Sequence, residues 1–184
     1  MEYGKKNTID SATLINKGLE IIEAVHLFHV PPEMIDVVVH RESVIHSMIE
    51  FIDNSIIAQI AVPDMKLPIQ YAITYPKRVE STVKPLDFKI YDNLTFFEPD
   101  YETFEGLNIC KKVISEGGIL PTVLNSANEE AVKLFLDKKI KFLDIIEIIK
   151  VCLKKIKNIN IYKLDDIIYY DKFIRDFINN DIDF

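Results

Sequence analysis

The sequence predicts an α+β fold in which a mixed α/β part is followed by a small helical bundle. β-branched runs separated by turn residues occur in the first half of the chain, and four helical patterns follow one another in the second half. An irregular, proline-containing stretch lies between them. We therefore expect the mixed part at residues 1–76, a connecting segment at 77–104 and the bundle at 105–184.

A long amphipathic helix is expected at residues 9–29. Asp10 or Ser11 is a suitable N-cap, because its side-chain oxygen can accept a hydrogen bond from a free amide of the first turn. Pro31 and Pro32 mark the end of this helix. Apolar residues recur in it at helical spacing: Ile15, Leu19, Ile22 and Val25.

The next segments alternate between strand and helix patterns. The β-branched run at 35–40 predicts a buried strand, and 47–62 predicts a hairpin that turns at residues 53–55. A short helix is expected at 66–75. In the second half, the predicted helices span 106–116 (ended by Gly117 and Gly118), 121–137, 142–155 and 163–179.

Charge and composition limit the classes of partner. The 184 residues carry a formal net charge of −7, which argues against duplex DNA or an anionic membrane as the main partner. No run reaches the roughly 18 apolar residues that span a bilayer. We expect a soluble chain that binds neither nucleic acid nor membrane. Cys110 and Cys152 are expected to be free thiols, although the sequence is also compatible with a disulfide.

The densest group of polar residues lies on the first predicted helix. Ser11, Asn16 and Lys17 are donors suited to an anion such as phosphate at a helix N-terminus. Glu20 follows about one turn later and is suited to a hard divalent cation. Spacing alone, however, favours a simpler interpretation, in which this is the solvated face of an ordinary amphipathic helix.

Other candidate residues are weaker when taken alone. His46 lies between predicted strands, and Met65 follows Pro63 in a loop, where a thioether can pack against a flat ring. Taken alone, a structural role is the favoured interpretation of both, and His40 is a further candidate histidine. The sequence has no glycine-rich phosphate loop and no zinc spacing, so it shows no nucleotide-binding unit of its own.

Several ordered motifs resemble one enzyme family. The string DSATLINKGLE at 10–20 is followed by HRESVIHSM at 40–48, PDMKLPI at 63–69 and PTVLNSANE at 121–129. Together they resemble the C-terminal half of 1-deoxy-D-xylulose-5-phosphate reductoisomerases, over roughly residues 4–150. The resemblance implies that residues 1–76 are the end of a catalytic domain. It also favours the interpretation of the first helix as a binding site.

The resemblance also implies roles. The family isomerises 1-deoxy-D-xylulose 5-phosphate and reduces the product with NADPH to 2-C-methyl-D-erythritol 4-phosphate, in the non-mevalonate route to isoprenoids. Lys17, Glu20 and His46 would be catalytic. Ser11 and Asn16 would join these three in binding the substrate, with the phosphate held by Ser11, Asn16 and Lys17. Glu20 would also bind Mg²⁺ or Mn²⁺.

Further expectations concern the cofactor and the partners. Gly4, Pro63 and Met65 would lie near NADPH, and the family is homodimeric. The family's N-terminal dinucleotide-binding domain, two further metal carboxylates and the tryptophan of its active-site flap have no counterpart here, so we expect this chain alone to be inactive. Two alternatives stay open: a non-catalytic module that dimerises, and an unrelated phosphate-binding helical protein. The expected location is the bacterial cytoplasm, with a plastid or apicoplast as the alternative.

Overall fold

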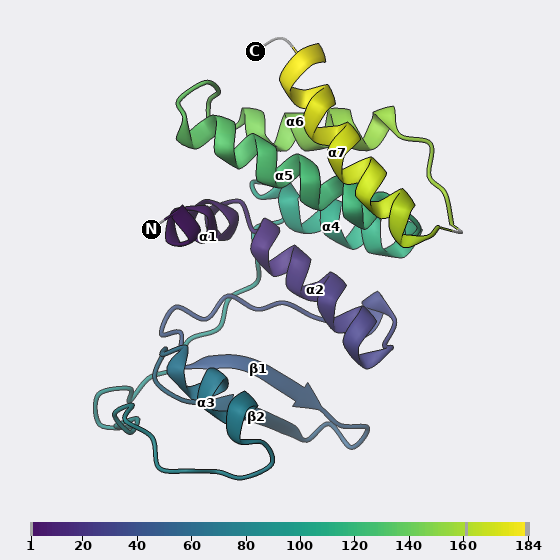
Figure 1. Cartoon of the computed structure of the whole chain (residues 1–184). Coiled ribbons are helices and arrows are strands. Elements are labelled where there is room, and N and C mark those ends of the chain that lie inside the picture. Colours follow the sequence, from purple (N-terminus) through teal and green to yellow (C-terminus); the bar gives the residue numbers. More distant parts are fainter. Residues whose placement is uncertain (1, 161, 183–184) are drawn as a thin grey trace. The chain divides into compact units, whose positions relative to one another are not determined.

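The computed structural model describes residues 2–160 and 162–182, and it divides the chain into two compact units (Figure 1). The helical unit comprises the residues up to Val37 together with those from Asp100 onward, and the hairpin unit comprises Val38–Pro99. The described residues form seven α-helices, one short 3-10 helix (Pro32–Met34) and a two-stranded sheet. The predicted α+β class is confirmed.

The first predicted helix is in fact two helices, α1 (Glu2–Ala12) and α2 (Ile15–Phe28). Between them Leu14 adopts a left-handed conformation with φ of 58°. The hydroxyl of Thr13 lies 3.2 Å from the carbonyl oxygens of Ile9 and Asp10 and 3.5 Å from the amide of Ile15. These local side-chain contacts compete with helical hydrogen bonding, and a single helix over 9–29 was therefore a wrong prediction.

The predicted N-cap was also wrong. Asp10 and Ser11 lie in the last turn of α1, and the residue that precedes α2 is Leu14, which has no side-chain capping bond. Among the described residues, the Ile15 amide has the Thr13 hydroxyl as a side-chain acceptor at 3.5 Å, whereas the amides of Asn16 and Lys17 have none. The predicted end was correct, because α2 stops before Pro31 with His29 in a left-handed conformation.

The core of the helical unit lies around α5. The helices α4 (Glu105–Glu116), α5 (Leu120–Leu136), α6 (Asp144–Lys155) and α7 (Leu164–Asp181) match the four predicted helical segments. α5 contacts α1, α4, α6 and α7, whereas α2 packs mainly on α4. The largest fully buried side chains of this unit are aliphatic: Ile15, Ile21, Leu107, Ile119, Leu124, Ile145, Ile149, Ile174 and Ile178.

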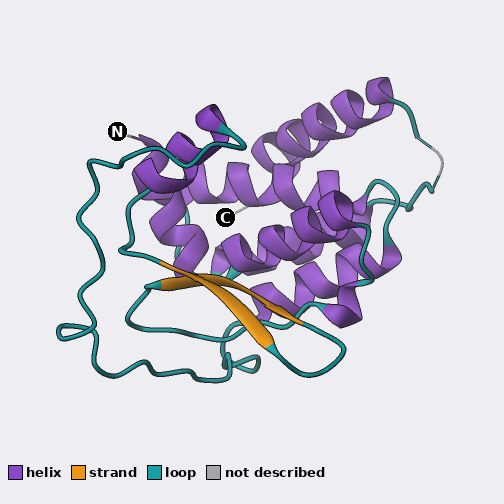
Figure 2. Cartoon of the chain, turned by 90° about the horizontal axis from the view of Figure 1, so that it is seen from below, coloured by secondary structure: helices purple, strands orange, loops and turns teal. Residues whose placement is uncertain are grey.

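The hairpin unit contains the predicted hairpin and the short helix α3 (Lys66–Thr74). The strands β1 (Ile45–Glu50) and β2 (Ile56–Ile60) pair antiparallel, with Ile49 opposite Ile57. The turn between them is stabilised by Asp53, whose carboxylate accepts hydrogen bonds from the amide and hydroxyl of Ser55. Figure 2 shows the two strands as one twisted ribbon. The expected absence of regular structure over 77–104 is confirmed.

The predicted strand at 35–40 does not form. Within the described residues, Val39 makes only an isolated bridge to Phe97, with backbone hydrogen bonds of 2.8 and 2.9 Å. A β-branched run becomes a strand only when a neighbouring strand satisfies its amides and carbonyls, and none lies beside this run in the described structure.

The hairpin is unusually exposed. Among the described residues of the hairpin unit, only Val44 and Pro99 are buried. Large aliphatic side chains on both strands and their turn face solvent, and Ile52 is fully exposed. A half-buried sheet normally packs one face on a core, and no such layer covers these strands within the hairpin unit. As for the helices, none in the described residues is long and apolar enough to cross a membrane.

We expect Gly18→Ala to destabilise the helical unit, even though alanine favours a helix over glycine. An added Cβ would lie 2.4 Å from both Cβ and Sγ of Cys110 on α4. Urea denaturation should show a loss of about 1–3 kcal/mol in the free energy of unfolding, as for an overpacked core.

Gly4→Ala is the matched control, because an added Cβ at Gly4 meets nothing within 4 Å. It should leave the stability unchanged or raise it by up to about 1 kcal/mol. Equal stabilities of the Gly18 and Gly4 variants would contradict a tight contact between α2 and α4.

Candidate functional site

The first turns of α2 bring three of the predicted site residues together. Asn16 Nδ2 donates to Glu20 Oε1 at 2.7 Å, and Lys17 Nζ forms an ion pair with Glu20 Oε2. Glu20 is exposed, and Asn16 and Lys17 are partly exposed, so this cluster faces solvent. Ser11 is exposed at the end of α1, just before the bend that leads into α2. Residues 11–17 are called the α1–α2 turn below.

The backbone of the α1–α2 turn favours an anion. The first amides of a helix have no intrahelical partner, and the helix dipole places partial positive charge at the same end. The Thr13 hydroxyl lies 3.5 Å from the Ile15 amide, and among the described residues no side-chain oxygen caps the amides of Asn16 and Lys17. Lys17 adds an ammonium group in the first turn of α2, which is paired with Glu20 in this structure. An anionic group with several acceptor oxygens therefore suits this end of the helix.

Behind the turn lies a buried polar contact that the sequence analysis missed. Asp10, only 1% exposed, accepts hydrogen bonds from Lys6 Nζ at 2.7 Å and from Asn128 Nδ2 at 2.9 Å. We interpreted Asp10 as a cap, and no feature of the sequence indicates a pairing across 118 positions. Two glycines complete this inner side: Gly18 lies against Cys110, and Gly106 lies against the carbonyl of Thr13.

The other predicted site residues belong to different parts of the chain. Gly4 is exposed on α1. In the hairpin unit, His46 is exposed on β1, at an irregularity where the register shifts between Ile45 and Ser47. Such a bulge re-aims a side chain relative to a regular strand. Pro63 and Met65 are exposed just before α3.

His40 has a structural role within the hairpin unit. Its Nδ1 lies 2.9 Å from the carbonyl oxygen of Thr95 and 3.0 Å from Glu42 Oε2, and its ring stacks on Phe96. The Thr95 hydroxyl, followed by the Thr95 amide, holds the pKa of Glu42 below its usual value. These contacts tie the segment before β1 to the end of the irregular stretch.

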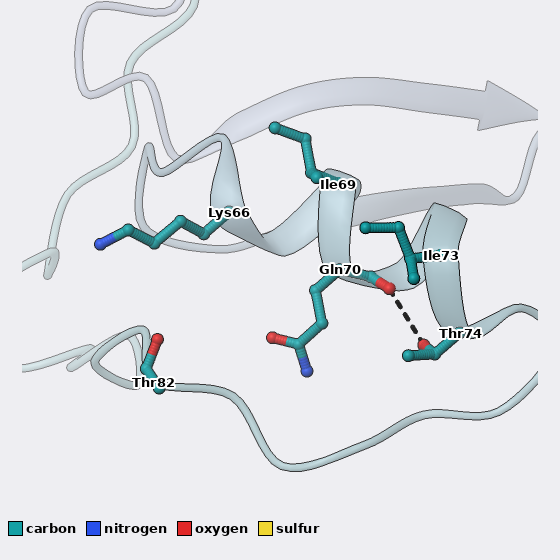
Figure 3. Close-up of a pocket in the computed structure, with 6 residues that line it drawn as sticks. All are labelled: Lys66, Ile69, Gln70, Ile73, Thr74 and Thr82. Carbon is teal, nitrogen blue, oxygen red and sulfur yellow. Dashed lines mark hydrogen bonds between the residues drawn. The ribbon is translucent and has the colours of Figure 1, made fainter.

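A hollow beside α3 is a poor candidate for the site. It is open to solvent, has a volume of about 340 Å³, and is lined by Lys66, Ile69, Gln70, Ile73, Thr74 and Thr82. Figure 3 shows that Lys66 is the one charged side chain among these residues. None of the predicted site residues lines it, and it offers no acid–base pair.

The residues present supply only part of a metal site. A hard divalent cation prefers several oxygen ligands, and Glu20 offers one accessible carboxylate. No group of three His, Cys, Asp or Glu residues suited to a metal ion occurs in the part of the chain that the structure describes.

Two models of known protein families match this chain. The pattern described as DXP reductoisomerase C-terminal domain matches residues 60–177. A second pattern, described as 1-deoxy-D-xylulose 5-phosphate reductoisomerase C-terminal domain, matches residues 1–28.

Individual relatives carry the same name. The chain is 53% identical over 175 residues to the 1-deoxy-D-xylulose 5-phosphate reductoisomerase of Clostridium tetani, covering 95% of this chain and 46% of that protein. It is 49% identical over 181 residues to that of Clostridium novyi, covering 98% of this chain and 47% of that protein. The chain thus spans a little under half the length of these relatives.

Solved structures agree. The reductoisomerase from Zymomonas mobilis in complex with NADPH matches with a TM-score of 0.88 and 47% identity, over 92% of this chain and 45% of that one. A DOX-P reductoisomerase in complex with NADPH, fosmidomycin and magnesium matches with a TM-score of 0.89 and 40% identity, over 95% of this chain and 45% of that one.

Both cysteines should be unreactive in the native protein. They are free and buried, and burial raises the pKa of each thiol to about 12, with the Asp10 carboxylate adding to the effect at Cys110. A thiol-specific reagent at pH 8 should therefore label neither cysteine in the folded chain and both in guanidinium chloride.

The raised pKa values of the two thiols make the free energy of unfolding depend on pH. An unfolded thiol ionises near its ordinary pKa of 9.0, whereas the buried thiols stay neutral until about pH 12. Stabilisation from this source is complete below pH 9 and decreases as the pH rises toward 12. Rapid labelling of Cys110 at pH 8 without unfolding would contradict the buried position.

Proposed function

Because the chain belongs to the 1-deoxy-D-xylulose 5-phosphate reductoisomerase family, we propose that it forms the substrate- and metal-facing part of such an enzyme. The complete protein would convert 1-deoxy-D-xylulose 5-phosphate into 2-C-methyl-D-erythritol 4-phosphate with NADPH. The observation that carries this proposal is the α1–α2 turn, where the amides and side chains of Asn16 and Lys17 lie beside the accessible carboxylate of Glu20.

In this proposal the α1–α2 turn binds the substrate phosphate. Ser11 and Asn16 would donate hydrogen bonds to phosphate oxygens, and Lys17 would supply a positive charge. In the free chain Asn16 and Lys17 are bonded to Glu20. An arriving phosphate would draw Asn16 and Lys17 toward itself, which would release the carboxylate of Glu20 for a cation.

Glu20 would then serve as one ligand of Mg²⁺ or Mn²⁺. A bound divalent cation supplies Lewis acidity for carbonyl and hydroxyl oxygens. The carboxylate lies one helical turn from the amides that would hold the phosphate, so one rigid element would fix both contacts. His46, exposed on β1, would contact the substrate as a third catalytic residue.

The remaining roles concern the cofactor and the partners. NADPH supplies the hydride, and Gly4, Pro63 and Met65 would pack near it. All three are exposed and therefore accessible to a cofactor. We further propose that the complete enzyme is a homodimer of the bacterial cytoplasm and that a dinucleotide-binding part lies in the portion of the relatives that this chain does not span.

The exposed hairpin favours a second candidate function, a non-catalytic module that associates with another chain. Ile49, Ile52, Ile56 and Ile57 are all more than half exposed, and apolar groups of this size often mark interaction sites. Light scattering of the 184-residue chain, together with an NADPH oxidation assay, distinguishes the two candidates. If the 184-residue chain associates, and NADPH oxidation is absent even when the chain is joined to an N-terminal portion, the module is favoured.

The catalytic proposal is tested by completing the chain. The N-terminal portion of the Clostridium tetani relative, fused ahead of this chain, should oxidise NADPH in the presence of the sugar phosphate and Mn²⁺, whereas the chain alone should not. In the fusion, Glu20→Gln should lower kcat roughly a hundredfold or more, because a metal ligand is lost. Lys17→Ala should raise KM for the sugar phosphate roughly tenfold or more and leave KM for NADPH unchanged.

Glu23→Gln provides the matched control, because Glu23 is an exposed carboxylate on the same helix, one turn beyond Glu20. It should leave both kinetic constants within about twofold of the parent fusion, as expected for a surface position. Unchanged kcat in the Glu20 variant, or turnover by the 184 residues alone, would refute the assigned roles.

A further inference from the structure

The α1–α2 turn is joined to the helical bundle by one buried hydrogen bond. Asn128 lies on α5 with no exposed surface, and its Nδ2 donates to Asp10 Oδ1 at 2.9 Å. The other carboxylate oxygen of Asp10 accepts from Lys6 Nζ on the same helix. Asn128 is therefore the donor that links Asp10 on α1 to the helix α5.

The chemistry of Asn128 indicates that this donation is its main polar contribution. Its Oδ1 is buried and has no hydrogen-bond partner among the described residues. Turning the amide over would bring Oδ1 against the carboxylate of Asp10 and remove the donor, so the carboxylate fixes the orientation. The buried Oδ1 destabilises the fold because it has no partner, and the hydrogen bond from Nδ2 to Asp10 is the interaction that offsets this cost.

The hydrogen bond between Asn128 and Asp10 matters for the site because of where Asp10 lies in the chain. Asp10 directly precedes Ser11, the proposed phosphate donor, and three residues later the backbone bends at Leu14. On the far side of the bend, α4 fixes the chain, since Gly18 lies against Cys110. The turn is thus held at its start by α5 and at its end by α4, while the donors of the site face outward.

We propose that Asn128 is a positioning residue: by holding the carboxylate of Asp10 from α5, it sets the place of Ser11 relative to the first turn of α2. The inference rests on the proposed function, since it concerns the same phosphate site. Asn128 itself touches no substrate. Its loss should let the end of α1 move, so that Ser11, Asn16 and Lys17 no longer converge on one phosphate.

The test uses three changes in the 184-residue chain. Asn128→Leu removes the donor, Asn128→Asp places two carboxylates against each other, and the double variant Asp10→Asn with Asn128→Asp restores a donor and an acceptor in exchanged positions. Ser126→Ala is the matched control, because Ser126 is a buried polar residue of the same helix whose hydroxyl bonds Asp171 on α7 instead.

Two measurements are made on each variant. Hydrogen exchange reports the order of residues 11–18, and a titration with inorganic phosphate, followed by the amide NMR signals of the turn, reports affinity. Asn128→Leu should speed exchange in the turn and weaken phosphate binding roughly tenfold each, the size expected for one buried, charge-assisted hydrogen bond. Exchange in α6 and α7 should stay unchanged, and the exchanged pair should recover most of both losses.

Distinct outcomes separate the two proposals. Exchange that rises equally throughout α4–α7, wild-type phosphate affinity in a folded Asn128→Leu chain, or a failure of the exchanged pair to recover would each overturn the positioning role. Lack of phosphate binding by the parent chain would count against the proposed function, and the exchange pattern would still decide the role of Asn128. If Asn128→Leu does not fold, Asp10→Asn, which keeps the shape and removes the charge, should give the same local pattern in weaker form.

Discussion

The close contact between α2 and α4 is the constraint on which the candidate site depends. Glycines at positions 18 and 106 let the two helices approach so closely that an added Cβ at either position would overlap its neighbour. This contact fixes which side of α2 faces the core, since Ile15, Ile21 and Ile22 are buried. The polar side of the helix is then held toward solvent on a rigid element, as a binding site requires.

A single left-handed residue, Leu14, separates α1 from α2 at the candidate site. It lies between the end of α1 at Ala12 and the start of α2 at Ile15, so that the first turn of α2 follows Ser11 closely in the chain. Asp10, four residues before the bend, is buried on the inner side, where Asn128 donates a hydrogen bond to it. The donors of the site thus face solvent, while Asp10 in the same short stretch of chain is buried.

The hairpin unit contrasts with this tightly packed region. Its strands form as the alternation of turn and β-branched residues predicts, yet nearly all their side chains remain accessible within the unit. The run at 35–40 has the composition of a strand and makes only the bridge through Val39. Both observations have one physical cause, because a strand needs neighbours for its backbone and a covering layer for its side chains.

Local patterns in the sequence determined much of this protein: the α+β class, the helices α3 to α7, the hairpin, and the association of Asn16, Lys17 and Glu20, which follows from helical spacing. Tertiary structure alone decided the burial of Asp10 and its partner Asn128. Helical periodicity and turn chemistry act between residues a few positions apart. A contact across 118 positions exists only because the helices that carry its two residues pack against each other.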